Sequence, residues 1–157
     1  LDCIYFLKSL QHIYRHYGGL RAVFENSYRD SGDLYSSMIE FRKLFFLHAD
    51  PGRTSKHVAD VTKGASAKRI NMFLRWMVRQ DNRGVDFGLW KGIPMDALYI
   101  PLDVHTGNVA RKLGLLQRKQ NDWKAVVELS SHLREYDPDD PVRYDFALFG
   151  LGSFERF

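Results

Sequence analysis

Apolar residues recur every three or four positions along much of the chain, which is the spacing of amphipathic helices. The first such run covers residues 1–17, and Gly18 and Gly19 end it. We expect a short helix over 20–28, and then a third helix that Asp33 caps and that Asp50-Pro51-Gly52 ends. The first third of the chain is therefore predicted to be helical.

The remainder of the chain follows the same pattern after a polar stretch at 51–67. Residues 68–78 contain few polar interruptions, which predicts a central, largely buried helix. Residues 80–101 are rich in glycine and proline and are expected to form a loop with one helical turn near 94–98. Further helices are expected from Asp103 to Gly114, from Asn121 or Asp122 to about Tyr136, and from Pro141 to Leu148. No segment shows sustained two-residue alternation, so the predicted fold class is all-α, in a single helical domain over 1–157.

Charge and cysteine content narrow the functional classes. A net charge of +4 favours a polyanionic partner, although only weakly. The single cysteine, Cys3, cannot form an internal disulfide or a four-cysteine zinc or iron–sulfur site, which favours a reducing compartment such as the cytoplasm. No apolar run is long enough to cross a bilayer, and no signal peptide is evident. Because the chain begins at Leu1 within a helical pattern, we expect a fragment that lacks upstream helices.

The first segment with candidate chemistry is Gly64-Ala65-Ser66-Ala67-Lys68. A glycine-containing turn that leads into a helix presents backbone N–H groups, which can hold a DNA phosphate without reading sequence. A lysine at such a helix start can act as an attacking amine. The alternative is a surface lysine at a helix entry, which is the commoner case.

The second segment is Pro101-Leu102-Asp103-Val104-His105. Asp103 is expected to cap a helix, and the same hydrogen bonds would hold its carboxylate ionised and oriented. His105 either contacts phosphate or has a structural role, which is the commoner case for a lone histidine at a helix start.

Together the two segments resemble the helix-hairpin-helix DNA glycosylase superfamily. The matching stretches are Gly64-Ala65-Ser66-Ala67-Lys68, Phe73-Leu74-Arg75, Leu102-Asp103-Val104-His105 and residues 109–115. Phe73-Leu74-Arg75 after a hairpin lysine is similar to the prokaryotic 8-oxoguanine glycosylase branches. The resemblance implies a hairpin at about 54–79 and a catalytic-aspartate helix at about 103–114.

Longer motifs at 68–79, 101–106 and 139–148 are similar to a bacterial family of the DUF2400 type. This resemblance covers most of the chain. This family resemblance does not specify an activity, so an activity as a glycosylase is implied only by the more distant resemblance to the superfamily.

The superfamily resemblance implies a base-excision glycosylase and AP lyase that acts on a damaged purine such as 8-oxoguanine. Lys68 and Asp103 would be the catalytic pair, with damaged double-stranded DNA as partner at the bacterial nucleoid and no membrane. The resemblance implies no catalytic metal and no iron–sulfur cluster. It does imply a monovalent cation bound by carbonyl oxygens of the hairpin. The expected DNA-binding residues are Lys63, Gly64, Ser66, Arg69, His105 and Arg111. The expected base-pocket residues are Trp76, Trp90, Tyr144, Asp145 and Phe146.

Two departures from the superfamily pattern leave alternatives open. Ser66 replaces the second glycine of the hairpin, which predicts a distorted phosphate-binding turn. The interval from Lys68 to Asp103 is longer than in most branches of the superfamily, and its extra residues lie around 86–91. If these residues filled the cleft, Lys68 and Asp103 would have a structural role only. An archaeal 8-oxoguanine branch has a similarly long interval. The alternatives are a non-catalytic DNA-binding module and a helical interaction domain with no nucleic-acid role. The enzyme hypothesis requires the Lys68 amine and the Asp103 carboxylate to face one solvent-reached cleft, within about 10 Å of each other, so that both can contact one nucleotide.

Overall fold

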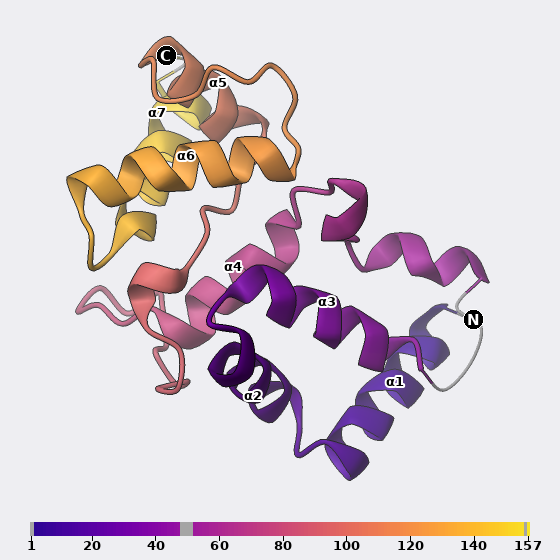
Figure 1. The fold of residues 1–157 in the computed structure, drawn as a ribbon. Helices are drawn as coiled ribbons and strands as arrows, with labels where there is room; N and C mark the ends of the chain where they lie inside the picture. Colours follow the sequence, from indigo (N-terminus) through magenta and orange to yellow (C-terminus); the bar gives the residue numbers. More distant parts are fainter. Residues whose placement is uncertain (1, 48–51, 156) are drawn as a thin grey trace. The chain divides into compact units, whose positions relative to one another are not determined.

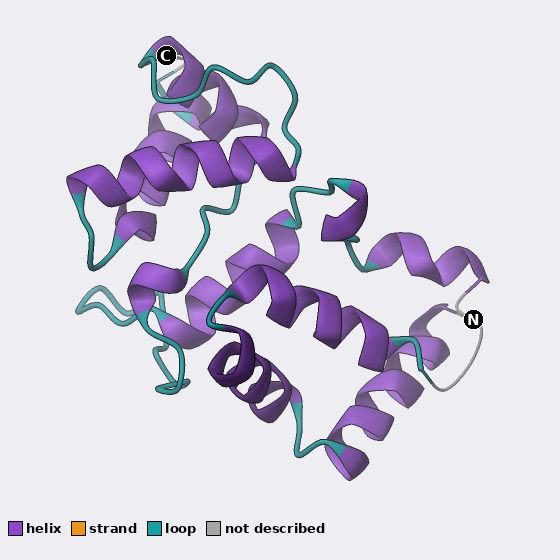
Figure 2. Ribbon diagram, viewed as in Figure 1, coloured by secondary structure: helices purple, strands orange, loops and turns teal. Residues whose placement is uncertain are grey.

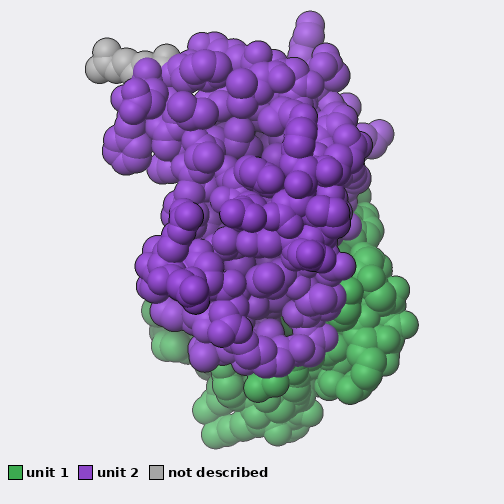
Figure 3. All heavy atoms as spheres, turned by 90° about the vertical axis from the view of Figure 1, so that its left-hand side faces the viewer, with its two compact units in different colours: residues 1–63 green, residues 64–157 purple. Residues whose placement is uncertain are grey.

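A computed structural model of the chain describes residues 2–47, 52–155 and 157, and its regular structure is helical (Figures 1 and 2). The described residues form no β-strand, so the all-α prediction is confirmed. The chain divides into two compact units, Leu1–Lys63 and Gly64–Phe157, which Figure 3 shows in different colours. The boundary falls inside the predicted hairpin segment. The interpretation as a single domain stays a prediction, and each unit is described by itself.

In its described residues, 2–47 and 52–63, unit 1 contains three α-helices and two short 3₁₀ turns. At the start of the third helix the Asp33 carboxylate accepts a hydrogen bond from the Ser36 N–H at 2.9 Å, which confirms the predicted cap. Phe24 stacks on Phe41 in the core, with ring centroids 5.1 Å apart. The predicted break at Asp50-Pro51 lies outside the described residues. The elements are α1 (Asp2–His16), α2 (Leu20–Ser31), α3 (Leu34–Phe45), η1 (Gly52–His57) and η2 (Val61–Lys63).

Unit 2, described over residues 64–155 and 157, contains four α-helices and two 3₁₀ turns in that part of the chain. The predicted turn near 94–98 is present, and Asp103 and Asp122 cap the two helices expected after them. Buried residues of the segment before α5, among them Ile100, pack near α6, where the Ile100 N–H donates to the Ser130 hydroxyl at 3.0 Å. The elements are α4 (Lys68–Val78), η3 (Met95–Ala97), α5 (Val104–Lys112), α6 (Trp123–Tyr136), η4 (Pro141–Tyr144) and α7 (Asp145–Ser153).

The last helix differs from its prediction. Pro141 opens the 3₁₀ turn η4, and α7 begins only at Asp145 and continues to Ser153. Gly150 and Gly152 have low helix propensity, so the sequence pattern ends the helix too early. In the fold α7 packs closely on α5, and a Cβ at Gly152 would lie 3.0 Å from the His105 carbonyl oxygen. Tertiary packing therefore extends the helix where propensity would stop it.

Helix α4 is buried on one face rather than all round. Leu74 and Val78 are buried, whereas Trp76 is 39% exposed and Lys68 and Arg69 face solvent. Arg75, the polar interruption in the apolar run, is buried. The expectation of a largely buried helix is thus correct for the face that carries Leu74 and Arg75 only.

Candidate active site

Lys68 and Asp103 meet at the starts of two helices of unit 2. The Lys68 Nζ lies 3.0 Å from the Asp103 Oδ2, although 35 positions separate the residues in sequence. The Lys68 side chain is 45% exposed and the Asp103 side chain 11%. The pair satisfies the distance that the enzyme hypothesis requires, and the long interval between the residues does not bury the amine.

Capping of α5 fixes the Asp103 carboxylate. Its Oδ1 accepts a hydrogen bond from the Thr106 N–H at 2.8 Å, and the Asn121 side chain donates to the Asp103 carbonyl oxygen at 3.1 Å. Burial opposes ionisation of this carboxyl, but the hydrogen bonds from Thr106 and the Lys68 ammonium hold its pKa below the ordinary value. Asp103 is therefore ionised at neutral pH, with one oxygen on the helix backbone and the other on Lys68.

The turn before α4 fixes Lys68. The backbone is left-handed at Gly64 (φ 83°) and at Ala67 (φ 49°), the residue immediately before the helix. Ser66 has no positive φ, so a serine is accommodated where the superfamily has glycine. The Gly64 carbonyl accepts from the Trp123 N–H at 2.8 Å, and the Ser66 carbonyl accepts from the Asn71 side chain at 3.1 Å. These contacts tie the turn to α6 and α4.

The Gly64 and Ser66 carbonyl oxygens each accept a hydrogen bond from a different internal donor. A carbonyl oxygen has two lone pairs, so each can still accept a further partner. The monovalent cation on hairpin carbonyls stays a prediction.

A buried ionic network continues along α4 from the Lys68–Asp103 pair. The Arg75 guanidinium binds the Asp145 carboxylate through Nη1 and Asp86 Oδ1 through Nε at 3.2 Å. One turn further, Arg79 binds Asp86 Oδ2 at 2.8 Å. The side chains of Arg75 and Asp86 are 3% and 0% exposed. Arg79 also pairs with Asp81 and, bidentately, with Asp140.

Sequence reasoning did not identify this network. The available signal was the pair Arg75 and Arg79, four positions apart in an otherwise apolar helix, because buried guanidinium groups need carboxylate partners. The partners come from the loop after α4, from the residue before η4 and from the start of α7, and their pairing depends on the fold. Asp86 belongs to the extra residues of the long interval, and it anchors them to α4.

Replacement of Arg75 by methionine should lower the free energy of unfolding by about 3–5 kcal/mol, because it leaves the Asp86 and Asp145 carboxylates buried without this cation. Arg69→Met, on the exposed side of the same helix, is the matched control and should change stability by less than about 0.5 kcal/mol. Urea unfolding of both variants makes the comparison. Equal stabilities would show that the network contributes nothing.

The titration of Asp145 gives a second prediction. Burial raises the pKa of this carboxyl to about 6, against the opposing effect of Arg75, and the nearby Asp103 carboxylate adds to the rise. A raised carboxyl pKa contributes stability that is fully present below the unfolded value of 3.8 and is lost as pH rises through about 6. Between pH 4 and 7 the free energy of unfolding of the wild type should fall by up to about 3 kcal/mol. The Asp145→Asn variant should not show this fall.

The measurement is the difference in unfolding free energy between Asp145→Asn and the wild type at each pH. The exposed Asp139→Asn serves as the control for removal of one carboxyl group of the same type. A flat profile for Asp145→Asn would refute the raised pKa.

The predicted DNA-binding residues have different surroundings. Arg69 is exposed and has no side-chain partner among the described residues, whereas Arg111 donates to the Arg118 carbonyl oxygen at 2.8 Å and to Asn121 Oδ1 at 2.6 Å. His105 Nδ1 lies 3.3 Å from the Gly152 carbonyl oxygen. Lys63 belongs to unit 1, 3.9 Å from Asp60. Arg111 thus holds the loop that carries Asn121 and so supports Asp103.

The predicted base-pocket residues are only partly brought together. Asp145 and Phe146 share Arg75, whose guanidinium carbon lies 4.5 Å from the centre of the Phe146 ring. Trp90 is 7% exposed and packs edge-on against Phe73, so it belongs to the core. Tyr144 packs near Tyr136, and Trp76 is on the exposed side of α4. The pocket assignment stays a prediction, and Phe146 has the strongest geometric case for it.

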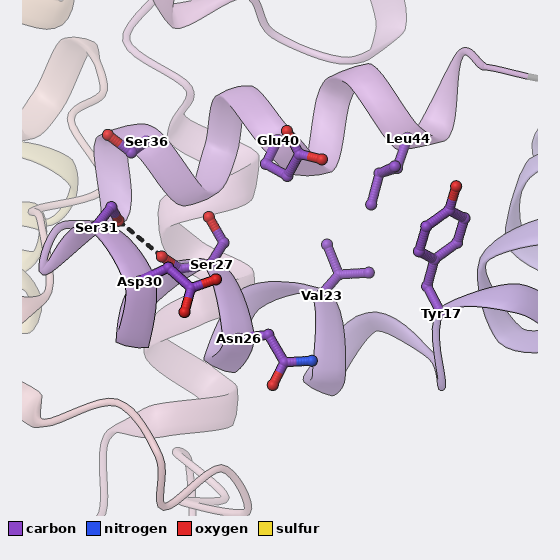
Figure 4. Close-up of a pocket in the computed structure, with 9 residues that line it drawn as sticks. All are labelled: Tyr17, Val23, Asn26, Ser27, Asp30, Ser31, Ser36, Glu40 and Leu44. Carbon is purple, nitrogen blue, oxygen red and sulfur yellow. Dashed lines mark hydrogen bonds between the residues drawn. The ribbon is translucent and has the colours of Figure 1, made fainter.

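Each unit contains a hollow. In unit 2 a space of about 220 Å³ is lined by Arg79, Asp81, Arg83, Asp140, Arg143 and Phe146. In unit 1 a more open space of about 480 Å³ lies along α2 and α3, polar toward Ser31 and Ser36 and apolar toward Val23 and Leu44 (Figure 4). There the Ser31 hydroxyl donates to the Ser27 carbonyl oxygen at 2.8 Å. Of these two hollows, the one in unit 2 contains a residue of the predicted site.

Neither a metal cluster nor a membrane-spanning helix is found in the described residues. Across 2–47, 52–155 and 157, no three His, Cys, Asp or Glu side chains gather in an arrangement that could hold a metal ion. None of the helices in those ranges combines the length and apolar character needed to cross a bilayer.

Comparison with known proteins places the chain in a family. No curated protein and no solved structure matches it. The model of the family described as "Protein of unknown function (DUF2400)" matches residues 1–154. That match includes both halves of the Lys68–Asp103 pair and the partners in the ionic network. The chain therefore belongs to the DUF2400 family.

Proposed function

We propose that this chain is a DNA base-excision glycosylase with AP-lyase activity, acting on a damaged purine such as 8-oxoguanine in the bacterial cytoplasm. The observation that carries the proposal is the contact between the Lys68 amine and the ionised Asp103 carboxylate, 3.0 Å apart, with the lysine open to solvent. A primary amine beside a fixed carboxylate is an arrangement suited to covalent catalysis through a Schiff base.

The first step would be attack on a nucleotide turned out of the duplex. The Lys68 ammonium first gives a proton to water. The amine so formed bonds to C1′ of the sugar as the glycosidic bond breaks, and the electron pair of that bond leaves with the base. The amine nitrogen then loses a proton, which the Asp103 carboxylate can accept and pass to the departing base. Opening of the sugar ring gives the imine between Lys68 and C1′.

Asp103 would act a second time through its charge. The sugar develops positive charge as the base departs, and a carboxylate held ionised by Thr106 stabilises it without rearrangement. Removal of a C2′ proton from the imine then expels the 3′-phosphate, which cleaves the strand by β-elimination. No step is routed through a metal or an organic cofactor.

Surface charge supports a DNA partner. Arg69 lies next to Lys68 in sequence and presents an unpaired guanidinium to solvent in the part of the chain that is described. Phosphate contacts of this kind position a duplex without reading its sequence. We assign the stacking surface for the extruded base to Phe146, which is 41% exposed and lies against Arg75.

The proposal is tested by borohydride trapping with the wild-type chain. Duplexes that carry an abasic site, 8-oxoguanine or no lesion are incubated with the protein in borohydride or in an equal concentration of chloride. We expect a covalent adduct only with borohydride, strongest at the abasic site, and nicked product without reductant. Tight duplex binding with no adduct on either lesion would instead support a non-catalytic DNA-binding module, and no DNA binding would support a helical interaction domain.

A further inference from the structure

The hollow of unit 1 between α2 and α3 has the size of a small-molecule site. Its volume is about 480 Å³, and ligand pockets commonly measure about 300–1,000 Å³. In a helix, side chains four residues apart lie on the same face, so each helix contributes one wall. These walls are Val23, Ser27 and Ser31 on α2, and Ser36, Glu40 and Leu44 on α3 (Figure 4).

The two ends of this hollow differ in polarity. Tyr17 and Leu44 lie at the apolar end, whereas Ser31 and Ser36 lie at the polar end, and Glu40 is between them (Figure 4). Four residues separate Glu40 from Leu44, which is about 6 Å along the axis of α3. The hollow therefore fits an elongated molecule with a polar head and an apolar stem.

The polar end is negatively charged. Asp30 and Glu40 both line the hollow, and none of the described residues that line it is cationic. Arg29 is bound by Asn26 Oδ1 at 2.8 Å, and Asp30 forms no ion pair with another described residue. Glu40 pairs with Lys43 at 3.2 Å, an exposed contact that contributes little. This local negative charge, in a chain of net charge +4, attracts a cation.

The serine hydroxyl groups at the polar end offer hydrogen-bond acceptors to a ligand. The Ser31 hydroxyl donates its proton to the Ser27 carbonyl oxygen at 2.8 Å, and the Ser36 hydroxyl donates to Asp33 Oδ2 at 2.7 Å. Because a hydroxyl group has one proton and two lone pairs, both oxygens present lone pairs to a further partner. Ionised carboxylates also only accept. The polar end therefore matches a cation that carries N–H donors.

We propose that this hollow binds a small organic cation, with its ammonium or guanidinium head between the Asp30 and Glu40 carboxylates and its apolar stem against Val23 and Leu44. The site lies within unit 1 and contains neither residue of the candidate catalytic pair. It is therefore a second binding site that goes beyond the proposed function and does not depend on it.

The test is an NMR titration of the isotope-labelled full chain with four probes of one shape. Phenylbutylammonium has the charge and the N–H donors, its trimethylammonium analogue has the charge alone, phenylbutanol is neutral and phenylbutyrate is an anion. Phenylbutylammonium should shift the backbone amide signals of residues 23–31 and 36–44 with a saturable curve. The trimethylammonium analogue and the alcohol should bind at least about tenfold more weakly, because each lacks a charged hydrogen bond, and the anion should not bind.

A double substitution separates the carboxylates from the shape of the hollow. Asp30→Asn/Glu40→Gln should weaken phenylbutylammonium binding at least about tenfold and leave the affinity for phenylbutanol within about twofold. The matched control is Glu25→Gln/Glu135→Gln, which removes two carboxylates that do not line the hollow and should bind both probes as the wild type does. Equal melting temperatures of the two variants would show that both are folded.

Three outcomes would overturn the inference. Equal affinity for the ammonium and the alcohol would show that the carboxylates select nothing. An equal loss in both double variants would assign the attraction to net charge rather than to this hollow. Absence of a saturable shift at residues 23–31 and 36–44 would remove the site. None of these outcomes bears on borohydride trapping at Lys68, and failure of trapping would leave this inference standing.

Discussion

Lys68→Gln is expected to lower the yield of borohydride-trapped adduct at an abasic site by at least about a hundredfold, to background, because it removes the attacking amine. The substitution should leave the fold intact, since the Lys68 side chain is nearly half exposed and its ion pair is on the surface. Arg69→Gln removes an equal charge from the neighbouring position and is the matched control.

The two variants are compared by adduct yield and by duplex affinity. Arg69→Gln should bind the duplex more weakly and still form the adduct, whereas Lys68→Gln should bind and form none. If Lys68→Gln forms adduct at the wild-type rate, the lysine is a helix-entry residue and the covalent mechanism is wrong.

Asp103→Asn should slow the single-turnover rate of base release by about 10²–10⁴-fold, because it removes the charge and the proton acceptor beside the amine. Stability should hardly change, since asparagine caps helices about as well as aspartate and can still accept from the Thr106 N–H. Loss of rate with an unchanged melting temperature therefore distinguishes a chemical role from a structural one.

Asp122→Asn is the matched control for Asp103→Asn. Asp122 caps α6 in the same way, accepting from the Ala125 N–H at 3.1 Å, and it pairs with Arg118 rather than with Lys68. Its replacement should leave the rate of base release within about twofold of wild type. A similar rate loss in both variants would mean that any helix cap in this unit matters equally, and Asp103 would have no special role.

The helices and caps were largely predictable from local sequence. Asp33, Asp103 and Asp122 each lie where a polar residue precedes an apolar repeat, and each accepts the hydrogen bond expected of a cap. The end of α7 was not predictable, because close packing at Gly152 overrides its propensity. Likewise the left-handed Ala67 gives no signal in composition, since alanine rarely adopts that conformation.

The two candidate catalytic residues could be selected from the sequence, whereas the buried ionic network beside them could not. Lys68 and Asp103 were selected from two motifs, but their contact depends on how α4 and α5 pack. Trp90 was expected to line the base pocket because aromatic rings stack on bases, yet its ring is used to pack the loop onto Phe73. Asp145 was named among the base-pocket residues, which stays a prediction; its carboxylate is bound by Arg75, a pairing that brings together residues 70 positions apart.

The most direct test of the central claim is to locate the covalent bond. The borohydride-reduced adduct between the wild-type chain and an abasic-site oligonucleotide is digested with protease and nuclease and analysed by mass spectrometry. The account predicts that the reduced sugar is attached to Lys68 Nζ alone. Attachment to any other lysine or to the terminal amine, or a stable complex with no covalent bond, would contradict it.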